Sequence, residues 1–249
     1  MNDRSWKAVS VNLGCGGPRA SEYREGVARW SQGAAGIVDI VFVQETPADD
    51  DWREIWSEYD IFESSGPLYR PRSAVIARKD LGGESFEYST SDYHGSYVAA
   101  ATVGDLVLMS VHASPNELSE QWRKQWTQPG RTLPDEYRGP LWDSDLVLET
   151  VRAQAEGRRV LACGDWNEAR RWDVNHSGGE GAAFFRQLAT MHLVDACCPG
   201  NEDAAPTHRD LCLDHIVTTR DVADRITVGR VMDQQPWPAD HRPVEFTIR

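Results

Sequence analysis

The sequence predicts a single α/β domain in which two β-sheets lie between helices. Short apolar runs recur along the whole chain, and segments with the i, i+3, i+4 spacing of an amphipathic helix lie between some of them. Most of these runs are nearly continuous, so both faces of the corresponding strands would be buried. No internal repeat, low-complexity tract or Gly/Ser linker divides the 249 residues, which fits one large domain.

The first predicted strand covers residues 8–13, where Val9, Val11 and Leu13 alternate with small or polar residues. Further strands are predicted, in chain order, over residues 37–43, 74–77, 97–103, 106–111, 160–163, 211–217 and 244–248.

Three helices are predicted from apolar residues that fall on one helical face. They rest on Tyr23, Val27, Trp30 and Ala34; on Leu141, Leu148, Val151 and Ala155; and on Phe185, Leu188 and Met191. Two long stretches, 113–140 and 168–182, lack strand character and directly follow predicted strands. Loops of this length in a compact domain are usually functional or mobile.

The charge balance is acidic, with 39 Asp and Glu against 26 Lys and Arg and a net charge of −13. Such a chain repels a polyanion, which weighs against non-specific coating of duplex DNA. It does not exclude a nuclease, because a divalent cation and a few local arginines can offset the charge. The longest apolar run, 37–43, contains Asp39 and is far shorter than the ~20 residues of a membrane span.

The five cysteines form no CxxC motif, and the N-terminal residues lack the apolar segment of a secretory signal. We therefore expect reduced thiols and a cytoplasmic protein. The adjacent Cys197 and Cys198 are expected to pack at a strand end rather than to bind a metal.

Polar residues follow, precede or interrupt the predicted apolar runs at six places. They are Asn12; Gln44 and Glu45; His112; Asp165 and Asn167; Asp214; and Asp240 and His241. A single carboxylate in such a position is usually a turn or helix-cap residue. Six such places in one chain predict an active site assembled at the ends of strands.

Six segments resemble, in order, the motifs of the endonuclease/exonuclease/phosphatase superfamily. They read SVNLG at 10–14, VQET at 43–46, SVHASP at 110–115, GDWNEA at 164–169, LDHIV at 213–217 and ADHRPVE at 239–245. The superfamily includes pancreatic-type deoxyribonuclease, abasic-site endonucleases, sphingomyelinases and inositol polyphosphate phosphatases. The resemblance implies a four-layer α/β/β/α sandwich, one catalytic domain over residues 1–249, and Mg²⁺-dependent cleavage of a phosphoester, with Mn²⁺ as a possible substitute.

The resemblance also implies roles for the polar residues. Glu45 would be the main metal ligand, with Asp240 and Asn12 nearby or bound through water. Carboxylate and amide oxygens are hard ligands that suit Mg²⁺.

The remaining residues would act on the phosphate. His241 would face it and pair with Asp214, while Asp165 would position or deprotonate the attacking water. Either Asp165 or His241 could be the general base. Asn167 would donate its amide to a phosphate oxygen, and His112 would bind the phosphate or protonate the leaving group.

Some features depart from the family's branches. In the deoxyribonuclease branch an upstream glutamate pairs with the histidine that corresponds to His112, and Glu63 could serve here. The SVNLG segment lacks the NGLR continuation of abasic-site endonucleases, and LDHIV lacks the Trp-x-Asp-Arg pattern of inositol phosphatases. Neither specialised branch is therefore supported.

Three segments combine aromatic residues with arginine and are candidates for substrate binding. The candidate residues are Arg70, Trp122, Arg123, Arg170, Arg171 and Trp172. Arginine pairs with phosphate and tryptophan stacks on bases, so the segments favour a nucleotide-containing substrate over a lipid or sugar phosphate. Trp122 and Trp126, spaced i and i+4, could equally pack one face of a helix.

Other functions remain open at this point. A phosphomonoesterase acting on a small metabolite or on an inositol or lipid phosphate is one. A catalytically inactive binding module is another, although every expected site position is filled. A zinc enzyme is a third, but the sequence has no HExxH motif and no paired CxxC. Endonuclease or exonuclease action, DNA or RNA as substrate, and the oligomeric state are not determined by these patterns.

Overall fold

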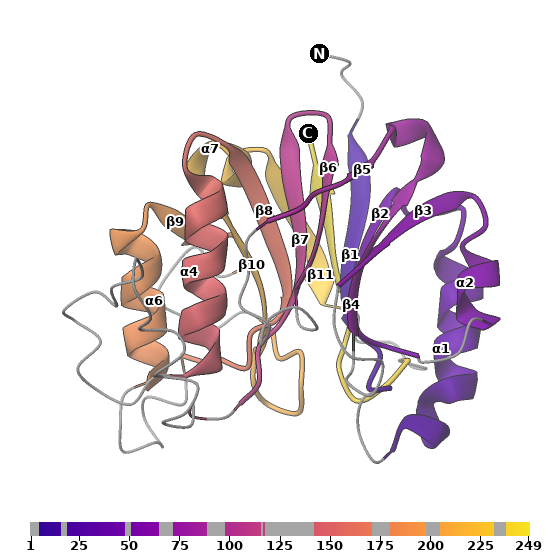
Figure 1. The fold of residues 1–249 in the computed structure, drawn as a ribbon. Coiled ribbons are helices and arrows are strands. Elements are labelled where there is room, and N and C mark those ends of the chain that lie inside the picture. The colour runs from indigo at the N-terminus through magenta and orange to yellow at the C-terminus, as the bar shows by residue number, and fades with distance from the viewer. Residues whose placement is uncertain are drawn as a thin grey trace.

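The computed structural model describes residues 5–15, 19–47, 51–64, 72–88, 98–115, 117, 142–170, 180–197, 205–231 and 238–249. Within these residues, two six-stranded sheets pack face to face, and helices cover their outer faces (Figure 1). This arrangement confirms the predicted four-layer α/β/β/α sandwich.

The first sheet has the strand order β11-β12-β1-β2-β4-β3. Its strands are β1 (Trp6–Asn12), β2 (Ile40–Thr46), β3 (Tyr59–Glu63), β4 (Arg72–Arg78), β11 (Ile226–Val231) and β12 (Val244–Ile248). β1 and β2 run parallel with Asn12 opposite Gln44, and the other pairs are antiparallel. The sheet is therefore mixed, and the ends of its two parallel strands carry predicted site residues.

The second sheet has the order β5-β6-β7-β8-β10-β9. Its strands are β5 (Glu84–Ser85), β6 (Val98–Val103), β7 (Leu106–His112), β8 (Arg159–Asp165), β9 (Leu193–Asp195) and β10 (Asp214–Thr219). Only β7 and β8 pair in parallel within the described residues. Each sheet thus has one parallel pair near its middle.

The helices form the two outer layers. α1 (Ala20–Ala34) and α2 (Asp51–Ile55) cover the first sheet, and α4 (Asp143–Ala155) and α6 (Glu180–Thr190) cover the second (Figure 1). The short helix α7 (Arg220–Ala223) and the 3-10 turn η1 (Lys79–Leu81) complete the elements. None of the described helices is long and apolar enough to cross a membrane.

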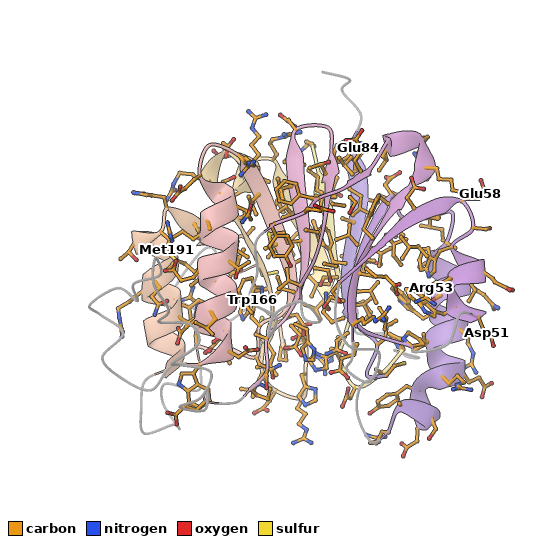
Figure 2. All side chains as sticks on the ribbon, in the orientation of Figure 1. Asp51, Arg53, Glu58, Glu84, Trp166 and Met191 are labelled. Atoms are coloured by element: carbon orange, nitrogen blue, oxygen red, sulfur yellow. The ribbon has the colours of Figure 1, made fainter. Side chains whose placement is uncertain are left out.

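Three layers of core hold the sandwich together. Between the sheets, the rings of Phe42 and Phe246 stack with centroids 6.0 Å apart. Trp56 is buried between the first sheet and its helices, and Trp166 is buried beside α4 (Figure 2). Burial on both faces explains why the strands read as nearly continuous apolar runs.

Every predicted strand overlaps an observed one, but two of them begin three residues later than predicted. β2 begins at Ile40, because the backbone N–H groups of Ile37 and Val38 close the end of α1 by donating to Ala34 O. β10 begins at Asp214 rather than at residue 211. The short strands β3, β5, β9 and β11 were not predicted, nor were α2, α7 and η1.

Candidate active site

The strand ends that carry the predicted polar residues meet at one edge of the sandwich, away from the two labelled chain ends in Figure 1. In the second sheet, β8 lies between β7 and β10, so Asp165 is in register with His112 on one side and with Asp214 on the other. The fold therefore places three predicted catalytic residues side by side on adjacent strands.

Asn12 connects the two sheets at this edge. Its Nδ2 donates to Glu45 Oε1 at 3.2 Å and to Asp165 Oδ2 at 3.0 Å, while its Oδ1 accepts the Gly14 N–H at 2.9 Å. Glu45 has a positive φ of 51°, which non-glycine residues rarely adopt. The amide of Asn12 thus orients two carboxylates, one from each sheet.

His241 and Asp214 form a buried pair, with His241 Nδ1 2.9 Å from Asp214 Oδ2. The backbone N–H groups of Leu213 and Asp214 donate to Thr207 Oγ1, which fixes the start of β10. Burial favours a neutral Asp214, but the charge and hydrogen bond of His241 lower the pKa of the Asp214 carboxyl overall. Burial likewise opposes charge on His241, yet Asp214 and Asp165 raise its pKa to about 10. The pair is therefore an imidazolium beside a carboxylate at neutral pH.

Asp165 lies between two imidazoles. Its Oδ2 is 3.8 Å from His241 Nε2 and 3.9 Å from His112 Nε2, and its Oδ1 accepts the Asn167 N–H at 3.0 Å. Burial, together with the neighbouring carboxylates, raises the pKa of Asp165 to about 6, although the two histidines act in the opposite direction. A carboxyl poised near neutral pH is suited to accept a proton.

The end of β8 needs its glycine. A Cβ on Gly164 would lie 1.9 Å from the carbonyl oxygen of Val111 and 2.9 Å from Gln44 Nε2, so no side chain fits there. Further on, Asn167 has a positive φ of 50°, and its Nδ2 donates to Ala113 O at 2.8 Å. The GDWN segment is thus packed closely against β7.

His112 faces Glu45, with its Nε2 3.5 Å from Glu45 Oε1. Glu63, which the sequence offered as a candidate partner of His112, does not contact it. Glu63 ends β3 at the edge of the first sheet and forms ion pairs with Arg53 at 2.7 Å and Arg72 at 3.7 Å. The acidic neighbours of His112 are instead Glu45 of β2 and Asp165 of β8.

Two groups of side chains among the described residues have the composition of a cation site. One comprises Asp165, Asp214 and His241, and the other comprises His208, Asp240 and His241. Asp240 is exposed, whereas His241 is buried, so the second group lies at the rim. The first group has two carboxylates and one imidazole, and carboxylate oxygens suit a hard divalent cation; the second has one carboxylate and two imidazoles.

Sequence reasoning missed two supporting features. Gln44 Nε2 donates to Ser110 Oγ at 2.9 Å, and Ser110 Oγ donates to Val43 O at 2.8 Å, so a buried polar bridge joins the sheets next to Glu45. The signal was a polar residue inside each of two apolar strands. The ring of His208 lies 4.6 Å from that of His241, and no local pattern indicated this contact.

Most of the predicted substrate residues lie outside the described residues; these are Arg70, Trp122, Arg123, Arg171 and Trp172. Arg170 is described. Its guanidinium lies 3.8 Å from the centroid of the Phe185 ring of α6, and its charge acts on Asp195 at the end of β9. Arg170 therefore packs against α6, and its role in substrate binding stays a prediction.

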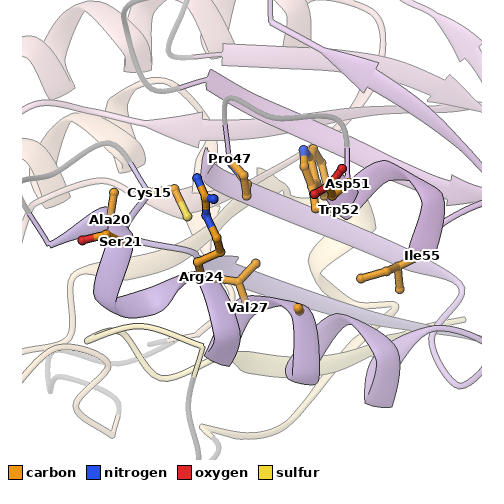
Figure 3. Close-up of a pocket in the computed structure, with 10 residues that line it drawn as sticks. Cys15, Ala20, Ser21, Arg24, Val27, Pro47, Asp51, Trp52 and Ile55 are labelled. Atoms are coloured by element: carbon orange, nitrogen blue, oxygen red, sulfur yellow. The ribbon is translucent and has the colours of Figure 1, made fainter.

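A separate pocket of about 680 Å³ lies between α1 and α2, lined by residues that include Cys15, Arg24, Val27 and Trp52 (Figure 3). None of the predicted catalytic or metal-binding residues lines it. Its wall adjoins the site, because the Cys15 N–H donates to Glu45 O at 3.2 Å.

The fold and the clustered residues define a hydrolase of phosphoester bonds. The model of the endonuclease/exonuclease/phosphatase family matches residues 9–241, and the chain belongs to that family. No curated protein matches the chain.

Several solved structures share the fold at low sequence identity. The endonuclease domain of TRAS1, a telomere-specific non-LTR retrotransposon, is 17% identical with a TM-score of 0.67, covering 99% of both chains. The AP endonuclease LMAP from Leishmania major is 12% identical with a TM-score of 0.70, covering 100% of this chain and 89% of its own. The 3′ phosphatase NExo from Neisseria, bound to a product DNA hairpin, is 18% identical with a TM-score of 0.65, covering 98% and 99%.

Proposed function

We propose that this protein is a Mg²⁺-dependent phosphodiesterase that cleaves nucleic acid or nucleotide-like substrates. The observation that carries the proposal is the position of Asp165, between His241 and His112 and joined to Glu45 through Asn12. Hydrolysis of a phosphodiester needs an aligned water, neutralisation of the phosphate oxygens and help for the leaving oxygen. This cluster contains a group for each task.

Glu45 would hold the metal ion, with Asn12 and Asp240 near it or bound through water. Their oxygens are the ligands that Mg²⁺ prefers, and Mn²⁺ accepts a similar set. When bound, the ion would polarise the phosphoryl oxygen and neutralise developing negative charge. The Asn12 amide would hold Glu45 and Asp165 at a fixed distance from each other, because it donates a hydrogen bond to both.

The proton transfers divide between Asp165 and His241. Because the pKa of Asp165 is raised to about 6, its carboxylate is the better acceptor for the proton of the attacking water. His241, whose pKa is raised to about 10, would remain protonated and direct Nε2–H towards the phosphate. Asp214 would orient this ring through its bond to Nδ1.

Two further residues complete the proposed machinery. One N–H of the Asn167 amide bonds to Ala113 O, which leaves the second to donate to a phosphate oxygen. His112 would bind the same phosphate or protonate the leaving oxygen, since its Nε2 points at the cluster of Glu45 and Asp165.

The proposed substrate class rests on similarity and charge. The titles of the similar structures name a retrotransposon endonuclease, an AP endonuclease and a 3′ phosphatase with product DNA, which supports nucleic acid as the substrate. The net charge of −13 opposes binding of long duplex DNA and favours short or single-stranded substrates. Hydrolysis of a terminal phosphomonoester is the second candidate, because one of these structures is a 3′ phosphatase.

A hydrolysis panel tests the proposal. The substrates are single- and double-stranded DNA, RNA, abasic DNA, 3′-phosphorylated DNA, nucleotides, inositol phosphates and sphingomyelin, each with Mg²⁺, with Mn²⁺ and with a chelator. The His241→Ala variant provides the background. We expect metal-dependent cleavage of nucleic acid and none by the variant. Exclusive activity on inositol phosphates or sphingomyelin, or equal rates in chelator, would contradict the proposal.

A further inference from the structure

A second histidine–aspartate pair, His215 of β10 with Asp195 of β9, lies directly behind the pair of His241 and Asp214. Asp214 and His215 are neighbours on β10, so their side chains point to opposite faces of the sheet. His215 faces α6, where the Phe185 ring lies 5.2 Å away. Its Nδ1 is 2.9 Å from Asp195 Oδ2, and the two side chains are only 0% and 2% exposed.

The other ring nitrogen of His215 reaches the turn after β8. Nε2 lies 2.8 Å from the carbonyl oxygen of Glu168, and a carbonyl can only accept, so Nε2 carries a proton. Although burial raises the pKa of Asp195, the charge and hydrogen bond of His215 and a bond from the Cys197 N–H lower it overall. Both ring nitrogens of His215 are therefore placed against oxygen atoms, one of Asp195 and one of Glu168.

The carbonyl that His215 holds belongs to the residue after Asn167. Asn167 has a left-handed backbone conformation, which persists only where its surroundings fix it. Glu168 is fixed twice, since its Oε1 also accepts from Ser144 Oγ of α4 at 2.5 Å. The Asn167 N–H in turn holds Asp165 Oδ1. A continuous chain of contacts thus runs from His215 to the carboxylate that faces the two imidazoles.

We propose that the His215–Asp195 pair is a positioning device that holds the Glu168 carbonyl and so keeps Asn167 and Asp165 in their reacting orientation. The inference rests on the proposed function, because it assigns these two residues to phosphoester cleavage. A buried pair of polar side chains, charged or not, is a weak source of stability compared with apolar packing, so stability alone is a poor reason for it at this place. His215 is a positioning residue and does not touch the substrate.

Two substitutions of His215 separate its contacts. In His215→Gln the side-chain amide can take the place of Nε2 and still donate to Glu168 O. In His215→Asn it can take the place of Nδ1 and donate only to Asp195. We expect His215→Asn to lower kcat by about 10- to 100-fold with KM changed by less than about 2-fold, whereas His215→Gln restores most of kcat.

Thr218→Val is the matched control for lost stability. Thr218 is buried on the same strand, and its Oγ1 donates to Val160 O at 2.6 Å, away from the turn after β8. We expect this variant to lower Tm without lowering kcat. Equal kcat in the two His215 variants, or a kcat that simply follows Tm across all three, would overturn the proposal.

Hydrogen exchange gives a readout that needs no substrate. We expect the Asn167 amide, which bonds to Asp165 Oδ1, to exchange faster in His215→Asn than in His215→Gln or Thr218→Val. If the wild type cleaves no phosphoester, the proposed function fails, while the exchange of the Asn167 amide still decides this inference.

If a His215 variant does not fold, Asp195→Asn replaces it. Faster Asn167 exchange in that variant supports the proposal, and unchanged exchange overturns it.

Discussion

The side chains of Asn12 and Asp165 are 3.0 Å apart across the junction of the two sheets, although 153 positions separate them in the chain. Through this bond the end of β1 in the first sheet holds the end of β8 in the second. The same amide nitrogen reaches Glu45, so one side chain sets the spacing between the proposed metal ligand Glu45 and the proposed proton acceptor Asp165.

Removing this link is expected to reduce both activity and metal binding. Asn12→Ala leaves two buried or half-buried carboxylates without their shared donor, and an unsatisfied buried group costs about 1–3 kcal/mol. We expect a lower kcat and a higher Mg²⁺ concentration for half-maximal rate, measured by metal titration of the hydrolysis rate. Ser10→Ala, a conservative change on the same strand, is the control. Wild-type rates and metal titration in Asn12→Ala would show that the link is dispensable.

The His241–Asp214 pair is expected to act as a unit. His241→Ala and Asp214→Asn should each lower kcat by orders of magnitude, and the double variant should be only slightly slower, because either change removes the same function. Circular dichroism checks that the variants fold. Losses that multiply in the double variant would mean that the two residues act independently.

Asp165 gives a pH dependence of defined sign. Because the carboxylate must be ionised to accept a proton, and its pKa is raised to about 6, kcat/KM should fall as the pH drops through about 6. The pKa of Asp165 in the folded protein lies above the ordinary aspartate value of 3.8, so this group stabilises the fold at low pH and that contribution is lost as the pH rises through about 6.

Asp165→Asn should therefore raise Tm relative to wild type at pH 7 to 8 in metal-free buffer, and this advantage should shrink towards pH 4. Thermal unfolding of both proteins across this range checks the sign. A variant less stable than wild type at pH 8 but equal at pH 4 would reverse the assignment.

The metal prediction concerns Glu45. Activity should require Mg²⁺ or Mn²⁺ and disappear in a chelator. Glu45→Gln replaces an anionic oxygen by a neutral amide and should weaken metal binding, measured by calorimetry with the metal alone. Glu63→Gln is the control, because Glu63 pairs with Arg53 at the sheet edge. Equal weakening in both variants would point to a general charge effect.

Substrate choice is expected to follow local rather than overall charge. Short or single-stranded nucleic acid should be preferred to long duplex DNA, with a shallow dependence of KM on salt. Trp172, which follows the GDWN motif, would stack on a base, so Trp172→Ala should raise KM more than it lowers kcat, at about 1–3 kcal/mol. A steep salt dependence on duplex DNA, with Trp172→Ala silent, would reject this preference.

The sequence predicted the strand ends well because polarity changes abruptly there. Asn12, His112 and Asp165 are each the last residue of a strand, and an apolar run that stops at a polar residue is visible without any structure. The central strands were predicted for the same reason, since burial on both faces makes them apolar throughout. The edge strand β3 reads Tyr-Asp-Ile-Phe-Glu and carries no such run.

Pairings between distant residues were harder to predict. Glu63 seemed an available partner for His112, but the sheet order places β3 at an edge, while β2 delivers Glu45. His215 was visible inside the LDHIV motif, yet its partners Asp195 and Glu168 come from another strand and from a turn. Arg170 followed the GDWN motif in sequence, but its direction depended on the ring of Phe185. Register and side-chain direction are set by packing, which local patterns do not encode.

β12 occupies an interior position, inserted between β11 and β1, with Trp6 opposite Ile248. His241 comes just before this strand, so docking of residues 244–248 helps to hold it beside Asp214. If His241 acts as proposed, we expect no hydrolysis by a partly folded chain, and we expect a protein cut ahead of this strand to be inert rather than slow. Loss of cleavage during gentle unfolding should thus report detachment of β12, which makes the reaction itself an indicator of whether the sandwich is closed.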